Sequence, residues 1–589
     1  MVYDDPNISF VRTLYRYGFL HVVYVYCSHE KVIHGGAFLN CGPDVVKRNI
    51  EEHFDDAQPT FYENTSAFAK NSSLHGLRFV GDDRLSLYER GFFFVSFLIA
   101  VLFSCNFIYE VYMEWVATPV IIGINPDLTY INEIPFPAIT ICNMNQALAG
   151  KVQNIKNGST EFAMLRLLCG RKPPINSKNV TKDWLLFQKF IVDVAQPCSK
   201  MLVSCRYGSD EMNCSHLFRT VVTDEGLCCA FNLIDTKFMY KNANMIDHFA
   251  AFNPPNITAV DWSPEEGYEP NLPPNFYPRS AAGVGKSMGL SLVLDAQVDE
   301  YYCSSTNGVG FKALLHNPAE IPDIANYGIS LQVGHEVGVT ITPDIADASY
   351  LLRNMERKYR QCMFSNEAQL NYYATYTRRN CEMECEAKLH RERCDCVQYY
   401  MPHIEPNANV CGLSDMKCSD SVRYKTHKTS EELYQCSEEC IPACFELGFS
   451  TNIYSSRLSH KQFLISDKPI QSMSEQYAED NIVAVHFYYT ERAFRSHTKQ
   501  QFVGFTEFLS DTGGLMGLFL GFSVLSIVEI IYYILIRPYF ATQRYNASVK
   551  YKRLVSNRQT GLPPTYQANL QYVARRYKRT IGFGKTLSK

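Results

Sequence analysis

The sequence lacks any strong excess of charge of one sign. Its 589 residues carry 56 Lys and Arg against 60 Asp and Glu, a formal net charge of −4. Proteins that bind nucleic acid through their overall charge need a clear basic surplus. We therefore expect no nucleic-acid partner. The imbalance is local instead, because residues 537–589 carry twelve basic side chains and no acidic one, whereas residues 91–536 carry 35 basic and 48 acidic side chains.

The sequence also lacks the common signatures of an enzyme or a metalloprotein. It has no HExxH motif and no phosphate-binding loop, and GFSVL at 521–525 lacks the second glycine of a nucleophile elbow. No CxxC pair occurs, which disfavours a zinc site. We expect no catalytic residue, no bound metal and no cofactor.

No secretory leader is expected at the N-terminus. The first apolar run, FLHVVYVYC at 19–27, has only nine residues, contains His21 and follows Asp4 and Asp5. A signal peptide instead needs a basic start and a longer uninterrupted apolar stretch. We expect this run to form a cytosolic strand.

Two longer apolar runs remain, and each is long enough to cross a bilayer. Gly91 to Tyr109 is 19 residues without a charge, and Thr512 to Ile536 contains only Glu529. A hydrocarbon core about 30 Å thick needs about 20 such residues in a helix. Basic residues precede the first run and follow the second, so the positive-inside rule places both termini in the cytosol. The expected product is a two-span plasma-membrane protein with a large extracellular domain.

The cysteines are segregated in agreement with that topology. Of 21 cysteines, eighteen fall between Cys142 and Cys444, in the part expected outside the cell. Disulfides persist in that oxidising environment, while cytosolic thiols stay reduced. Four glycosylation sequons lie in the same part, at Asn157, Asn179, Asn213 and Asn256.

The last ten cysteines are spaced as mirror images about residue 403. Cys381 and Cys385 are spaced i, i+4 and so share a helix face, as do later cysteines of the set. Two antiparallel helices joined by successive disulfides would satisfy this spacing. The expected pairs are Cys396–Cys411, Cys394–Cys418, Cys385–Cys436, Cys381–Cys440 and Cys362–Cys444.

Five segments, in order, carry a resemblance to a known family. They are LHGL (74–77), FPAITICN (136–143), GLSLVLDAQVDEYY followed by GFKALLHNPAEIP (289–322), CEMECEAKLHRERCDCVQYYMP (381–402) and GLMGLFLGFSVLSIVE (514–529). Together they resemble the degenerin, epithelial sodium channel and acid-sensing ion channel superfamily. The stretch 289–322 looks more like the peptide-gated and degenerin branches than the acid-sensing one, and the chain most resembles the invertebrate neuropeptide (FMRFamide)-gated sodium channels.

The resemblance implies an α+β membrane protein that forms a homotrimer with a sodium or cation pore blocked by amiloride. Two transmembrane helices would flank a disulfide-rich domain with a β-sheet palm and β-ball and a helical finger, knuckle and thumb. The expected domains are a cytosolic N-terminal region (1–90), helix 1 (91–115), a ligand-sensing ectodomain (116–508, thumb 345–445), pore-lining helix 2 (509–536) and a cytosolic tail (537–589).

The same resemblance implies further disulfides. It pairs Cys142 with Cys228 and Cys205 with Cys214, and it reproduces the five thumb pairs expected from spacing. It leaves four ectodomain cysteines for two extra bridges of undetermined pairing: Cys169, Cys198, Cys229 and Cys303.

The second apolar run has two acidic residues and a glycine period. If the helix stays regular, Asp511 and Glu529 are five whole turns apart, on one face and separated by about 27 Å. Three copies would then form an acidic ring at each end of a cation path, although Asp511 could instead cap the helix N-terminus. Gly513, Gly517 and Gly521 recur every fourth residue and would let helices approach closely.

The resemblance assigns roles to other residues near the pore. Gly521, Phe522 and Ser523 match a Gly-x-Ser selectivity filter, but Phe522 replaces a small residue, so we expect altered selectivity and blocker affinity. Ser510 matches the position where bulk holds relatives open. His75 and Gly76 match a His-Gly gating motif.

The stimulus and partners are further expectations. Residues 240–288, rich in proline and poor in periodicity, are expected to form a long finger loop, and the resemblance favours opening by an extracellular RFamide-like peptide. Proton gating, constitutive or mechanosensory activity, and a non-conducting receptor or adhesion ectodomain are the alternatives. In the tail, the PPxY string Pro563–Tyr566 is a candidate ligand for a WW domain, and RRYKR at 575–579 is expected to bind anionic lipid.

Overall fold

The computed structural model describes residues 61–170, 183–241, 256–367, 370–402, 409–426, 436, 439–459 and 467–556. The chain divides into two compact units. A membrane unit comprises Met1–Phe103 with Met516–Lys589, and an ectodomain unit comprises Ser104–Leu515. Four expected features lie outside the described residues: the strand at 19–27, the sequon at Asn179, the PPxY string and the basic cluster at 575–579.

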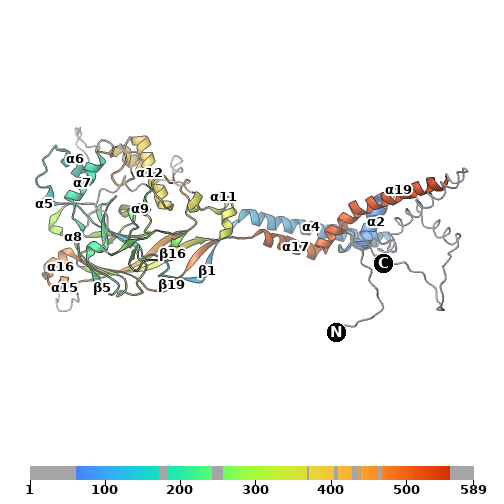
Figure 1. Cartoon of the computed structure of the whole chain (residues 1–589), viewed down its shortest axis with the longest axis horizontal. Helices are drawn as coiled ribbons and strands as arrows, with labels where there is room; N and C mark the ends of the chain where they lie inside the picture. The colour runs from blue at the N-terminus through green and yellow to red at the C-terminus, as the bar shows by residue number, and fades with distance from the viewer. Residues whose placement is uncertain are drawn as a thin grey trace, which may run out of the picture. The chain divides into compact units, whose positions relative to one another are not determined.

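The ectodomain unit is built on an eight-stranded sheet (Figure 1). The strand order is β1-β19-β16-β18-β12-β4-β5, and β17 also pairs with β16. The pairs are antiparallel except that β16 runs parallel to β18 and to β19. The strands are β1 (Val120–Tyr130), β4 (Leu202–Tyr207), β5 (Asp210–Met212), β12 (Leu290–Asp295), β16 (His335–Ala348), β17 (Glu446–Arg457), β18 (Ile482–Tyr489) and β19 (Ala493–Gln501).

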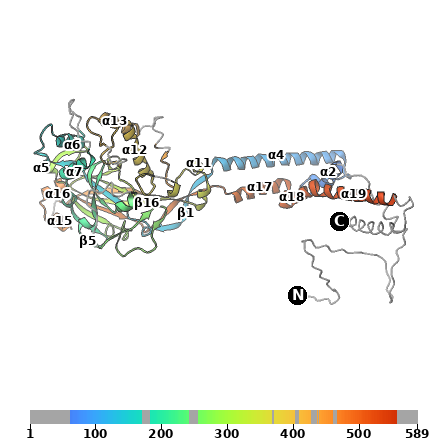
Figure 2. The ribbon, with the colours of Figure 1, turned by 45° about the horizontal axis from the view of Figure 1, so that its top comes forward.

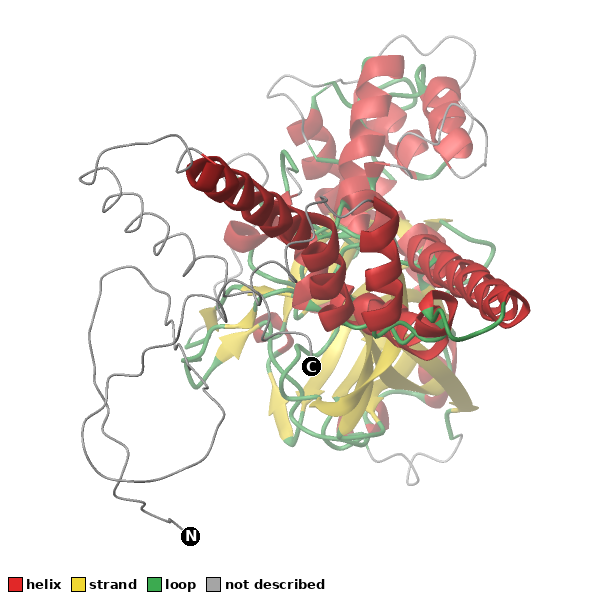
Figure 3. Ribbon diagram, turned by 90° about the vertical axis from the view of Figure 1, so that its right-hand side faces the viewer, coloured by secondary structure: helices red, strands yellow, loops and turns green. Residues whose placement is uncertain are grey.

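A second sheet of five strands lies in the same unit, in the order β15-β14-β2-β7-β6. Its strands are β2 (Ala138–Asn143), β6 (Phe218–Thr223), β7 (Gly226–Phe231), β14 (Phe311–His316) and β15 (Ile329–Leu331). Next to it, β3 (Asn145–Leu148) pairs with β13 (Tyr301–Ser304). Figure 3 shows the strands gathered in one body with the ectodomain helices outside it.

The main hydrophobic core lies between the two sheets. Leu290, Leu292 and Leu294 alternate along β12 and point into this core, where they meet Ile139 and Phe311 of the second sheet. The alternation follows from the two-residue period of a strand. Each such side chain stabilises the fold by about 1.5–3 kcal/mol on burial. The opposite face of β12 packs on α15 (Lys468–Gln471) and α16 (Glu475–Asn481).

Short helices form a separate cluster at one end of the ectodomain. Ser159 caps α6 (Thr160–Leu168) and Asp183 caps α7 (Trp184–Val194), each by accepting backbone N–H bonds. The apolar faces of α6 and α7 pack together, and the Cys169–Cys303 disulfide joins the end of α6 to β13. The other short helices of the unit are α5 (Ala149–Val152), α8 (Cys198–Met201), α9 (Thr236–Met239), α10 (Ile324–Tyr327) and α11 (Arg357–Arg360).

The expected thumb contains two neighbouring helices, α12 (Arg378–Cys394) and α13 (Met416–Thr426) (Figure 2). All five disulfides of the mirror-image set are present, and Cys394–Cys418 joins the two helices directly. Cys142–Cys228 and Cys205–Cys214 are present too. The four remaining cysteines pair as Cys169–Cys303 and Cys198–Cys229, which the sequence left open.

The segment at 240–288 differs from the expected finger loop. Residues 242–255 lie outside the described part, but residues 256–288 form short paired strands: β8 (Thr258–Ala259), β9 (Trp262–Ser263), β10 (Gly267–Tyr268) and β11 (Phe276–Tyr277). Trp262 is buried in a cluster with Ile134, Ala319 and Leu447. Glu265 pairs with Arg353 and accepts the backbone N–H of Ser365. Residues 256–288 are thus mainly loop, as expected, but the short strands and the burial of Trp262 pack them onto the ectodomain, which their weak periodicity did not indicate.

Among the described residues, two helices are long and apolar enough to cross a membrane: Leu87–Ala117 and Val524–Lys550. The first is α4. The second combines α18 (Val524–Ile531), the π-helical turn η7 (Tyr532–Ile536) and the start of α19 (Arg537–Ser556). It is preceded by α17 (Phe505–Leu520), so the expected single helix over 509–536 is interrupted. The membrane unit also contains α2 (Phe61–Asn71) and α3 (Leu77–Gly81).

Candidate functional site

The interruption between α17 and α18 occupies Gly521, Phe522 and Ser523, the three residues that match the filter. Gly521 has a φ of +65°, a left-handed conformation in which glycine is strongly favoured and which commonly ends helices. The N–H of Phe522 still bonds to the carbonyl of Met516, at 3.2 Å. Ser523 then starts α18 as its N-cap. The sequence therefore breaks the helix at one glycine and restarts it two residues later.

The His-Gly motif packs against this break. The backbone N–H of His75 donates to the carbonyl of Leu520 at 2.8 Å, which satisfies one of the carbonyls that a helix end leaves unpaired. A Cβ added to Gly521 would lie 2.6 Å from Cδ2 of the His75 ring. Gly76 has a φ of +79° and precedes α3. The structure therefore brings His75, Gly76 and Gly521 together, although 445 residues separate Gly76 from Gly521.

Glu529 faces the same N-terminal segment. Its Oε2 accepts the backbone N–H of Ser73 at 3.0 Å and the hydroxyl of Ser73 at 3.1 Å. The condition under which Asp511 and Glu529 would share one helix face is not met, because the break at Gly521 interrupts the 100° repeat of a regular helix. Ser73 was missed by sequence reasoning, and only its position two residues before His75 could have drawn attention to it.

The remaining pore candidates lie on α17. Asp511 is not an N-cap, because α17 begins at Phe505, so this alternative is wrong. Ser510 and Asp511 are exposed. A Cβ at Gly513 would meet nothing within 4 Å, and one at Gly517 would be 3.8 Å from the carbonyl oxygen of Phe522. The glycine face of α17 is therefore open at Gly513 and nearly so at Gly517, whereas His75 covers Gly521.

Aromatic contacts join α2 to the π-helical turn η7 in the membrane unit. The rings of Phe68 and Tyr533 meet edge to face at 5.6 Å, and the guanidinium of Arg537 lies 5.2 Å from the Tyr533 ring centroid. Tyr533 belongs to the π-helical turn η7, and such turns often occur at functional positions. Helix α2 thus packs against the same end of the second span (Figure 1).

At the ectodomain end of the spans, α4 and α17 are joined by Trp115. Its ring stacks on Phe508 with a centroid distance of 5.0 Å, and its Nε1–H donates to the carbonyl of Val503 at 3.0 Å. Both contacts lie within the ectodomain unit. A movement of the segment that precedes α17 would therefore act on the end of α4 and on the start of α17.

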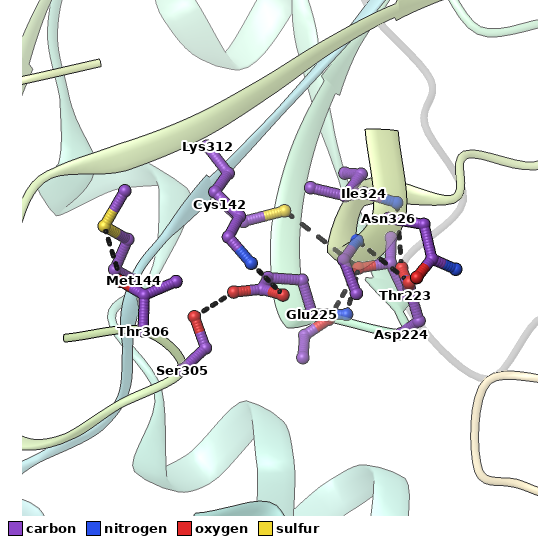
Figure 4. Close-up of polar contacts among 12 residues, drawn as sticks. Cys142, Met144, Thr223, Asp224, Glu225, Ser305, Thr306, Lys312, Ile324 and Asn326 are labelled. Carbon is purple, nitrogen blue, oxygen red and sulfur yellow. Dashed lines mark hydrogen bonds and ion pairs between the residues drawn. The ribbon is translucent and has the colours of Figure 1, made fainter. Parts of the chain in front are cut away.

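A buried polar cluster at the β6–β7 turn is a second candidate site (Figure 4). Nζ of Lys312 lies 2.8 Å from Oε2 of Glu225, and both side chains are largely buried. The hydroxyl of Ser305 donates to the same carboxylate. The neighbouring carboxylate of Asp224 accepts the backbone N–H groups of Ile324 (3.0 Å) and Ala325 (2.9 Å). The cluster thus joins the β6–β7 turn to β14 and α10.

This cluster continues to the thumb through Asp323. Burial, and next the charge of the neighbouring Asp323, raise the pKa of Asp224 to about 7. Asp323 in turn pairs with Arg379 at 2.6 Å, in the first turn of α12. Sequence reasoning missed this series of contacts, because the sequence shows only an Asp-Glu-Gly turn. Nothing in the sequence indicates which distant residues contact that turn.

Comparison with known proteins decides the family. Residues 68–533 match the family described as amiloride-sensitive sodium channel. The chain belongs to the amiloride-sensitive sodium channel family. It is 42% identical over 480 residues to Pickpocket protein 28 of Drosophila melanogaster, covering 81% of this chain and 79% of that protein.

Two more distant members of the amiloride-sensitive sodium channel family are similar over most of their length. Sodium channel protein Nach of Drosophila melanogaster is 23% identical, covering 80% of this chain and 86% of that protein. Acid-sensing ion channel 4-B of Danio rerio is 24% identical, covering 80% and 75% respectively. The chain is thus a plasma-membrane channel for sodium or other cations and not an enzyme, and its disulfide-rich ectodomain between two apolar helices is the architecture expected from the sequence.

Proposed function

We propose that three copies of this chain form one pore, with Gly521, Phe522 and Ser523 as its selectivity filter and with an extracellular ligand as its opener. One observation carries the pore assignment: a long apolar segment loses helical structure at Gly521–Ser523. Irregular backbone at membrane depth is tolerated only where it is covered by protein or lines a water-filled cavity. A cation path is such a cavity, and backbone carbonyls can replace the water around an ion.

The open glycine face of α17 supports the assembly. Because none of the described residues comes within 4 Å of a Cβ at Gly513 or Gly514, room remains there for a helix of another copy. Small residues allow helices to approach closely in a membrane. Phe522 narrows the expected filter relative to the small residue of the family pattern, so we propose that it sets the selectivity of this channel.

We further propose an RFamide-like neuropeptide as the ligand. The resemblance of residues 289–322 to peptide-gated channels supports this choice. The same stretch borders a cavity of about 240 Å³ beside β12, lined among others by Arg206, Glu211, Asp467 and His486. The carboxylates of Glu211 and Asp467 are suitable partners for the arginine of such a peptide.

Gating would pass from the ectodomain to the spans. Ligand binding opens a channel only if the open arrangement binds the ligand more tightly than the closed one. The disulfide-linked thumb would transmit such a difference, and Trp115 with Phe508 joins the end of α4 to the start of α17 within the ectodomain unit. We propose that the second spans then separate near Asp511.

The test is a recording from oocytes that express the full chain. Amidated RFamide peptides, a step to pH 5 and no stimulus are compared, each with and without amiloride. The variant Ser510→Phe serves as a ligand-independent positive control, because bulk at this position is expected to hold the channel open. A peptide-evoked, amiloride-sensitive sodium current supports the proposal. Current only from Ser510→Phe, or only at pH 5, overturns the peptide as ligand while leaving the pore in place.

The cavity is tested separately. Glu211→Gln and Asp467→Asn should each raise the half-maximal peptide concentration by about tenfold, since a lost charge-assisted contact weakens binding by about that factor. Asp480→Asn, on the exposed face of α16 and outside the cavity, is the matched control. Unchanged peptide sensitivity in both cavity variants places the ligand elsewhere.

A further inference from the structure

Ser73 lies at the centre of a hydrogen-bonded chain in the membrane unit. Its hydroxyl is 2.8 Å from the hydroxyl of Ser526 and 3.1 Å from Oε2 of Glu529. Its backbone N–H donates to the same carboxylate oxygen at 3.0 Å. Ser73 therefore uses both its main chain and its side chain to hold two residues of α18.

Ser526 extends this chain to the proposed filter. Its hydroxyl oxygen accepts the backbone N–H of Ser523 at 3.1 Å, and the Ser523 hydroxyl accepts the N–H of Ser526 at 3.4 Å, which forms a reciprocal capping box. Ser526 is only 1% exposed. The continuous path is thus Glu529, Ser73, Ser526 and Ser523, and its last member is the third filter residue.

The surroundings make these bonds important for geometry. Around the serines, α18 is apolar, with Val524, Leu525, Ile527 and Val528 in the same helix. A polar group left unpaired in such an environment is costly, and hydrogen bonds are stronger there than in water. Because Ser526 is buried, loss of the Ser73 hydroxyl removes one of the hydrogen bonds of the Ser526 hydroxyl and should shift the start of α18.

The other side of the break is held by the same short segment. The N–H of His75 bonds to the carbonyl of Leu520, the last residue of α17. Residues 73–76 therefore contact the end of one helix and the start of the next. The three filter residues lie between these two attachment points.

We propose that Ser73 is a positioning residue for ion selectivity. It fixes the start of α18, and hence Ser523, by joining the Ser526 hydroxyl to the Glu529 carboxylate. In this arrangement Glu529 acts as the acceptor that orients Ser73, and not as a charge in the ion path. The inference rests on the proposed filter at Gly521–Ser523.

The experiment measures the sodium-to-potassium permeability ratio from reversal potentials. Full-length Ser73→Ala, Ser73→Thr and Ser72→Ala are recorded in the Ser510→Phe background, with surface protein quantified. Ser73→Ala should change the ratio by about threefold or more, as expected for loss of one net hydrogen bond. Ser73→Thr keeps the hydroxyl and should restore the original ratio. Ser72→Ala is the matched control, because the Ser72 hydroxyl accepts the N–H of Leu74 and makes no hydrogen bond to α18 within the described part of the chain.

Two further variants separate this inference from the proposed filter. Phe522→Ala must change the ratio if the filter is at Gly521–Ser523. An altered ratio in Phe522→Ala with a wild-type ratio in Ser73→Ala overturns the role of Ser73 alone, whereas unchanged ratios in both overturn the filter as well. Glu529→Gln retains an acceptor oxygen, so it should preserve the ratio and the conductance. A large drop in conductance would overturn the acceptor role and place the charge in the ion path.

A contact measurement covers variants that conduct no current. Ser73→Cys combined with Ser526→Cys should form a disulfide under mild oxidation, detected by mass spectrometry of the cross-linked peptides. Ser72→Cys with Ser526→Cys should not. Cross-linking of the control pair in preference to the 73–526 pair overturns the proposal whether or not the channel conducts.

Discussion

The ring of His75 lies against Gly521, so close that the glycine has no room for a side chain. The main chains of His75 and Leu520 are hydrogen-bonded at the same place, at 2.8 Å. The residue pair that the family resemblance assigns to gating and the first residue of the proposed filter are therefore one structural element. The residues expected to act in gating and those proposed for selectivity therefore share a contact.

Gly521→Ala should abolish most of the current. The added Cβ would come 2.6 Å from the His75 ring, and the φ of +65° costs an L-residue about 1–2 kcal/mol. Gly76→Ala should have a milder effect, because Gly76 has a similar φ but open space around it. Gly76→Asn should be milder still, since asparagine tolerates this conformation. Current per surface channel is the measurement, and equal losses at Gly521 and Gly76 would contradict the contact.

The pKa of Asp224 predicts a pH-dependent stability. Because burial raises it to about 7, the folded protein keeps a proton that the unfolded chain loses above about pH 4. This stabilisation is therefore complete at low pH and is lost as pH rises towards 7. The midpoint of thermal unfolding should rise on acidification from pH 8 to 5, and Asp224→Asn should show a smaller rise. Parallel curves for the two proteins would exclude Asp224 as the source.

Lys312 and Glu225 form a buried ion pair, and removing only one of the two charges should strongly destabilise the fold. Lys312→Met leaves the Glu225 carboxylate buried without its cation, at a cost of about 3–5 kcal/mol. The double variant Lys312→Met with Glu225→Gln should recover much of the stability, because no charge is then left unpaired. Denaturant unfolding of purified protein measures both.

An exposed ion pair supplies the control for that experiment. Lys286 and Glu336 also pair, but both side chains are more than 40% exposed. Lys286→Met should therefore lower the free energy of unfolding by only about 0–1 kcal/mol. A loss as large as that of Lys312→Met would show that burial does not account for the difference.

The Cys394–Cys418 disulfide should be a main source of thumb rigidity. It joins α12 to α13 across a sequence separation of 24 residues. Replacing both cysteines, by Cys394→Ala with Cys418→Ala, should lower the free energy of unfolding by about 3 kcal/mol. The single free cysteine among the described residues, Cys105, gives the matched control Cys105→Ala, which should unfold like the wild type. A lowered unfolding midpoint with unchanged ligand response would separate stability from gating.

The sequence by itself determined the features that depend on local pattern. Apolar length predicted the first membrane-crossing helix and the presence of a second, although the second long apolar helix is Val524–Lys550 and not 509–536. The mirror-image spacing of ten cysteines predicted the thumb bridges, because it is set by distances along the chain. Cysteine segregation placed the ectodomain for the same reason. The pairing of Cys169 with Cys303 could not be predicted, because 134 residues separate them and only the folded sheets bring them together.

Only the tertiary structure decided what the acidic and glycine residues do. A regular helix would have aligned Glu529 with Asp511, but one glycine in a left-handed conformation ends that helix and redirects the chain. Glu529 instead meets Ser73, and Asp224 is linked through Asp323 to Arg379 at the start of the thumb helix. Such contacts arise from long-range packing of buried polar groups, which must find partners wherever the fold places them. The spacing of residues along the chain does not predict which partners they find.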